Sequence, residues 1–191
     1  MIIFTRSFQL FSVLLLVFLL QACASIKANV SNPLILSESS RIVVGPIANN
    51  SDTPLANRQV ESMTIALLQA KGFKHLLPYK RKQSCEKLLY CPDESYTRDE
   101  LIRWGRQNHV QYILTGATNE WRYKVGLDGE PVAGVSLFIL HVNSGRTIWS
   151  AVGSAIGGSR QGLDVIGQKL LIRLLQSISA KEISSTTIST K

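Results

Sequence analysis

Apolar residues recur along the first half of the chain with two different spacings, which predict strands that alternate with helices. The run RIVVGPI at 41–47 is rich in β-branched residues and is typical of a strand, and we expect a second strand at 73–78. Between them, the residues from 60 to 68 place apolar side chains at helical spacing. We expect this helix to begin at Asn57 as its N-cap and to end before Gly72.

A capping box marks the start of a second helix. Thr97 is followed three residues later by Glu100, and this pair can satisfy the first free N–H groups of a helix. The predicted helix runs through RDELIRWGRQN at 98–108, and a strand follows at 110–118. The strand continues into EWRYKV, so we expect either a long strand or a hairpin there.

The last third of the chain predicts a hairpin followed by a helix. Strands at 133–142 and 146–155 flank Asn143-Ser144-Gly145, which is a turn sequence. A final helix is predicted from 162 to 177. Its apolar stripe consists of Leu163, Ile166, Leu170, Leu171, Leu174 and Ile178.

The predicted order is therefore β-α-β-α-β-β-β-α, which indicates an α/β fold with a small mixed sheet. The two early crossover helices imply parallel strands, and the later hairpin adds antiparallel ones. We expect a single α/β domain over residues 41–178. Residues 23–40 show little periodic pattern and predict a tether, and the Ser/Thr-rich residues 179–191 predict a flexible tail.

The amino terminus has the pattern of a bacterial lipoprotein signal. The apolar run LFSVLLLVFLL at 10–20 is shorter than the roughly 20 residues that a spanning helix needs. It ends in Leu20-Gln21-Ala22-Cys23, which predicts a signal peptide at 1–22 and lipidation of Cys23. An ordinary secretory signal with a chance cysteine is the alternative. Ala24, rather than Asp, follows the cysteine, as in lipoproteins that are sent to the outer membrane and face the periplasm.

The chain is basic, with a formal net charge of +8, and loss of the signal with Arg6 would lower this by one. A basic surface suits nucleic acid, anionic lipid or an acidic partner. For a periplasmic lipoprotein we expect no nucleic acid, and phospholipid headgroups are the favoured partner. A solvated surface without a partner is the alternative.

Cys85 and Cys91 lie in one polar stretch, QSCEKLLYCPDES. Because the periplasm is oxidising, we expect a local disulfide between them. A metal site is the other possibility, but the only histidine close in sequence is His75. We therefore favour the disulfide and expect no metal.

No catalytic motif is visible in the sequence. His75, His109 and His141 belong to different predicted elements, and there is no Gly-x-Ser-x-Gly, P-loop or dinucleotide-binding glycine pattern. We therefore expect neither an enzyme nor a cofactor.

The most unusual stretch is EWRYKVGLDGEP at 120–131. On a strand, Trp121 and Tyr123 would share one face, and Arg122 and Lys124 would share the other. The pattern is also typical of an edge strand whose charges prevent aggregation.

Three segments and the lipoprotein signal resemble the PelC family, outer-membrane lipoproteins of the Pel exopolysaccharide secretion system. The segments are EWRYKVGLDGEPVAGVSL at 120–137, HVNSGRTIWSAVGS at 141–154 and VGPIANNSDTP at 44–54. The last segment is shared more widely with TolB-like and CsgG-like lipoproteins. This wider kinship implies a TolB N-terminal-like α/β sandwich.

The resemblance implies a non-enzymatic protein that forms a homo-oligomeric ring, a dodecamer in the family, beneath the outer membrane. One rim would meet the bilayer through lipid chains with nearby aromatic and basic side chains. The other rim would be acidic and would collect a cationic amino-sugar polymer for a PelB-like porin.

The resemblance also suggests roles for particular residues. The candidates for the acidic rim are Asp93, Glu94, Asp128 and Glu130, which lie in predicted loops, and ordinary solvation of these loops is the alternative. The candidates for membrane or subunit contacts are Trp121, Arg122 and Trp149, of which Trp149 also suits core packing because it lies inside a predicted strand. A CsgG-like pore-forming lipoprotein is the alternative function, but the sequence shows no clear pair of added membrane-crossing stretches.

Overall fold

The computed structural model describes residues 24–80, 96–126 and 129–182. Its strands and helices, in chain order, are β1 (Ser25–Val30), β2 (Leu34–Ser37), β3 (Arg41–Asn49), α2 (Ala56–Ala70), β4 (His75–Pro78), α3 (Arg98–Gln107), β5 (Tyr112–Tyr123), β6 (Pro131–His141), β7 (Arg146–Ile156), α4 (Leu163–Leu175) and β8 (Ile178–Lys181). The α/β class and the mixed sheet that the sequence predicts are confirmed.

Six strands form the main sheet in the order β1-β7-β6-β5-β3-β4, and β2 and β8 form a separate parallel pair. β3 runs parallel to both β4 and β5, as the early crossover helices require. β5, β6, β7 and β1 are joined by antiparallel pairings, so the predicted hairpin at 133–155 is confirmed as β6 and β7.

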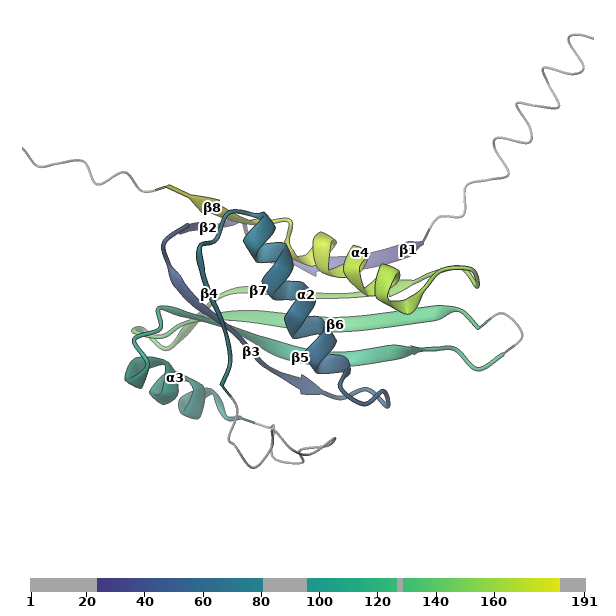
Figure 1. Ribbon diagram of the computed structural model, residues 1–191, viewed down its shortest axis with the longest axis horizontal. Helices are drawn as coiled ribbons and strands as arrows, with labels where there is room; N and C mark the ends of the chain where they lie inside the picture. The colour runs from purple at the N-terminus through teal and green to yellow at the C-terminus, as the bar shows by residue number, and fades with distance from the viewer. Residues whose placement is uncertain (1–23, 81–95, 127–128, 183–191) are drawn as a thin grey trace, which may run out of the picture.

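Two helices, α2 and α4, pack on one face of the sheet (Figure 1). The core between them and the sheet contains Leu114 of β5 together with Ile166, Leu170 and Leu174 of α4. The preceding β5 residue, Ile113, points to the other face and packs there with α3. Because α3 covers only the end of that face where β5 begins, no helix among the described residues lies over the remaining half of the face.

The prediction that residues 23–40 form a tether is wrong for most of that segment. β1 pairs antiparallel with β7 along its whole length, and Ile26, Ala28 and Val30 pack against the core. The alternating pattern in SIKANV was too short and too polar to stand out, because half of its residues face solvent. β2 also belongs to the fold, since it pairs with β8, and the latter occupies part of the predicted tail.

The helix boundaries confirm some of the predicted signals. At α3 the Thr97 side chain accepts a hydrogen bond from Glu100 N–H, and the Glu100 carboxylate accepts one from Thr97 N–H. At α2 the N-cap is Leu55 rather than Asn57. Asn57 is buried and its side-chain amide donates to the carbonyl of Ile47 at 3.0 Å, so it links the helix to β3.

Candidate functional site

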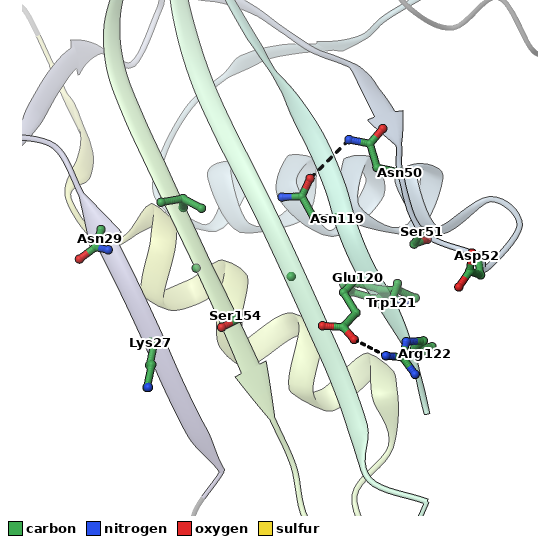
Figure 2. Close-up of a pocket in the computed structure, with 13 residues that line it drawn as sticks. Lys27, Asn29, Asn50, Ser51, Asp52, Asn119, Glu120, Trp121, Arg122 and Ser154 are labelled. Atoms are coloured by element: carbon green, nitrogen blue, oxygen red, sulfur yellow. Dashed lines mark hydrogen bonds and ion pairs between the residues drawn. The ribbon is translucent and has the colours of Figure 1, made fainter. Parts of the chain in front are cut away.

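A polar groove occupies the half of the sheet that α3 leaves bare. Figure 2 shows residues that line this groove, and its volume is about 560 Å³. Its floor includes Gly134 of β6 and Ser154 of β7, where small residues leave the sheet surface low. The walls come from segments far apart in sequence, namely Lys27 and Asn29 of β1, Asn50 to Asp52 of the loop after β3, and Asn119 to Arg122 of β5.

The groove carries both signs of charge together with several amides. Glu120 and Arg122 form an ion pair at 2.8 Å, and both side chains are partly exposed, so the pair contributes little to stability. The Asn50 amide donates to Asn119 Oδ1 at 3.4 Å. Asp52 has no ion-pair partner within the described ranges. These groups can hydrogen-bond hydroxyl and amine groups, but they do not pair a nucleophile with a general base.

Trp121 and Trp149, both proposed as membrane or subunit contacts, are buried in the core at 1% exposure each. Trp121 donates its indole N–H to Gln59 Oε1 at 2.8 Å, and Trp149 donates to Ser177 Oγ at 2.9 Å. Each indole therefore has its polar atom satisfied inside the fold. The predicted contact role is wrong for both tryptophans.

The face assignment in the stretch from 120 to 123 is confirmed. Trp121 packs toward α4, and the Tyr123 hydroxyl accepts a hydrogen bond from the Leu163 N–H, at the first residue of that helix. Arg122 points to the groove face beside Glu120, where it is exposed. Of the three proposed contact residues, Arg122 alone has a free surface.

The predicted acidic rim is only partly visible. Glu130 pairs with Lys124 at 3.0 Å across the β5–β6 hairpin, so its charge is matched locally. The other three rim candidates, together with the three cysteines, lie outside the described residues; they are Cys23, Cys85, Cys91, Asp93, Glu94 and Asp128.

The remaining titratable groups do not gather into a metal site. In the part of the chain that the structure describes, no cluster of His, Cys, Asp and Glu is arranged to hold a metal ion. His141 hydrogen-bonds Ser144 Oγ at 2.9 Å. A hydrogen bond to Glu38 raises the pKa of Lys74, but this exposed pair lies outside the groove.

A second hollow lies between α3 and the β3–β4 edge of the sheet. It also measures about 560 Å³, and its cationic lining consists of Arg41, Arg58 and Lys80. Tyr79 and Trp104 line its aromatic part, with ring centroids 4.7 Å apart. The sequence did not single out this hollow, because its residues come from β3, α2, β4 and α3, which are separate in the chain.

Comparison with solved structures identifies the relatives of this fold. A PelC dodecamer from Paraburkholderia phytofirmans aligns with a TM-score of 0.70 and 29% identity, over 83% of this chain and all of the other. A single-substitution variant of that dodecamer aligns at 30% identity, also with a TM-score of 0.70, over 82% of this chain and all of the other. The chain belongs to the PelC family.

A more distant solved structure shares the fold. Lipoprotein GNA1162 from Neisseria meningitidis shares the fold, with a TM-score of 0.55 and 16% identity over 72% of this chain and 96% of the other. No family model and no curated protein matches the sequence. Among the described helices, none has both the length and the apolar character needed to cross a bilayer.

Most of the groove residues were not identified from the sequence. Lys27 and Asn29 were assigned to a tether, and the polar loop at 50–52 was given no role. The available signal was the alternation of Ile26, Ala28 and Val30, which places the intervening Lys27 and Asn29 on one exposed face.

Proposed function

We propose that this chain is a non-enzymatic, lipid-anchored subunit of a ring on the periplasmic side of the outer membrane. The ring guides a cationic, Pel-type exopolysaccharide to an outer-membrane porin. The observation that carries the proposal is the similarity to dodecameric PelC over the whole length of the solved chain.

The position of β1 supports an anchor at Cys23. Only one residue separates Cys23 from Ser25, where β1 begins, and Ser25 pairs with Ile156 at the end of β7. The anchored end is thus the end of the sheet where β5 finishes and α4 starts. With so short a connection, this end of the domain must lie close to the bilayer surface.

The side chains at that end suit a phospholipid surface. Val125, at the tip of the β5–β6 hairpin, is 99% exposed, and Tyr123 beside it is also exposed. Arg122 and Lys124 lie on either side of Tyr123, and Val125 follows Lys124. An apolar side chain next to cations can enter the headgroup region while the cations contact lipid phosphates.

The carboxylates that lack an ion-pair partner are the groups that could attract a cationic polymer. Three described carboxylates are ion-paired, in Glu38–Lys74, Glu120–Arg122 and Glu130–Lys124. Asp52 has no ion-pair partner among the described residues. Guidance would then depend on many weak, salt-sensitive contacts, to which Asp93, Glu94 and Asp128 would add.

The oligomer is tested on the detergent-extracted, full-length chain by native mass spectrometry. We expect a species of many copies, twelve if the chain follows the solved relatives. A strict monomer at every concentration would contradict the ring.

The anchor is tested by the Cys23→Ser variant. We expect a soluble periplasmic form and reduced polysaccharide export. The weak contacts that the hairpin side chains make with lipid cannot hold the protein on the membrane without acyl chains. Membrane retention equal to that of the unaltered chain would rule out the anchor.

A further inference from the structure

The bare half of the sheet exposes large apolar side chains. Phe138 of β6 and Val152 and Ile156 of β7 are between 37% and 48% exposed. Strand register puts them on one face, since Val152 pairs with Ser136, two residues before Phe138, and Ile156 pairs with Val132. An antiparallel sheet that faces water normally carries polar residues at such positions. Exposed apolar side chains on neighbouring strands indicate a surface that is covered in the assembled protein.

A second apolar surface lies on the opposite side of the sandwich. Val165 and Ile172 of α4 are 47% and 49% exposed. They are seven residues apart and therefore share one helix face, which is opposite to the face that α4 buries against the sheet. Within the described residues, no element of the chain packs over this stripe.

A ring built from one kind of subunit needs two different, complementary surfaces on each copy. A two-fold dimer uses one surface twice, whereas a closed ring joins head to tail. We propose that the bare sheet face of one copy packs against the outer face of α4 of the next copy. This inference rests on the proposed ring and names the residues that would close it.

The shapes and charges of the two surfaces agree with this pairing. The sheet face is hollowed by the groove, and a helix presents a convex ridge that fits such a hollow. Lys169 lies between Val165 and Ile172 on the ridge, while Asp52 in the groove wall has no ion-pair partner among the described residues. Opposite charges would then meet where the apolar side chains pack.

The direction of the strands also agrees with the pairing. The anchored end is an end of the strands, so the sheet face and the helix face both point sideways relative to the membrane normal. Copies that pack through these two faces keep all their anchors on one side of the ring. An interface through the strand ends would instead place a neighbouring copy between the anchored end and the bilayer.

The test uses Val152→Glu on the sheet face and Ile172→Glu on the helix face, in the full-length chain extracted in detergent. Native mass spectrometry is expected to show loss of the ring in each variant. Ile35→Glu is the matched control, since Ile35 is 63% exposed but belongs to the separate β2–β8 pair. The control should keep the ring. Circular dichroism melting verifies that each variant folds, and Val152→Lys replaces Val152→Glu if it does not.

Mixing the two variants gives the decisive result. Val152→Glu retains an intact helix face and Ile172→Glu an intact sheet face, so the mixture should form a one-to-one heterodimer and nothing larger. Rings that persist in either variant, or a mixture that stays monomeric, would overturn the inference. A ring lost equally in Ile35→Glu would also overturn it. If the unaltered chain is itself monomeric, both the proposed ring and the proposed interface are wrong. If rings form in the unaltered chain and persist in the variants, only the proposed interface is wrong.

Discussion

The Trp121 ring of β5 lies directly over the Cα of Gly167 in α4, where a Cβ atom would overlap the indole. The absence of a side chain at 167 allows α4 to approach the sheet closely enough to bury this tryptophan. The contact fixes the position of α4, and α4 in turn presents Val165 and Ile172 outward.

Replacing Gly167 by alanine should lower the free energy of unfolding by about 1–3 kcal/mol, because the added methyl must displace a buried ring. Chemical denaturation measures the change. Gly158→Ala is the matched control, since nothing lies within 4 Å of a Cβ there, and its effect should stay within about 0.5 kcal/mol. Equal stability of the two variants would mean that Trp121 and α4 do not touch as described.

Trp149→Phe should destabilise the protein by about 1–3 kcal/mol, because it removes buried volume and leaves Ser177 Oγ without its indole donor. Membrane association of the folded protein should not change, since Trp149 does not reach the surface. Thermal melting and flotation with vesicles measure the two effects separately. A stable variant that no longer floats would restore the membrane role that burial excludes.

The buried Glu61 carboxylate accepts a hydrogen bond from the Ile47 N–H at 2.8 Å. Glu61→Ala should therefore cost about 1–3 kcal/mol, because a buried N–H loses its acceptor. Glu120→Ala, which breaks an exposed ion pair, should change stability by less than about 1 kcal/mol. Urea unfolding of both variants checks the contrast, and a larger loss from Glu120→Ala would contradict it.

The hairpin tip should contribute to membrane binding. In the Cys23→Ser background, Val125→Asp should weaken binding to anionic vesicles several-fold, because the exposed tip would carry a charge that the headgroups repel. Ile35→Asp adds the same charge elsewhere on the surface and should have a smaller effect. Sedimentation with vesicles at low and high salt measures both, and equal losses would remove the hairpin from the membrane surface.

Several features of the fold were predictable because each depends on residues close together in the chain. The Thr97–Glu100 capping box spans one helical turn, and the turn at 143–145 joins strands that are adjacent in sequence. The candidate site was less accessible to sequence reasoning. Trp121 looked like a surface residue in an alternating strand, and its burial depends on Gly167, which is more than forty residues away.

The sequence by itself determined the order of most strands and helices, the lipoprotein signal and the resemblance to PelC, since these follow from local patterns of residues. Only the tertiary structure decided that Ser25–Val30 joins the sheet, which face of the sheet stays bare and which tryptophans are buried. Pairings such as Ser25 with Ile156 depend on backbone hydrogen bonds and packing between distant segments. Backbone hydrogen bonding is common to all residue types, so no local pattern reveals the partner.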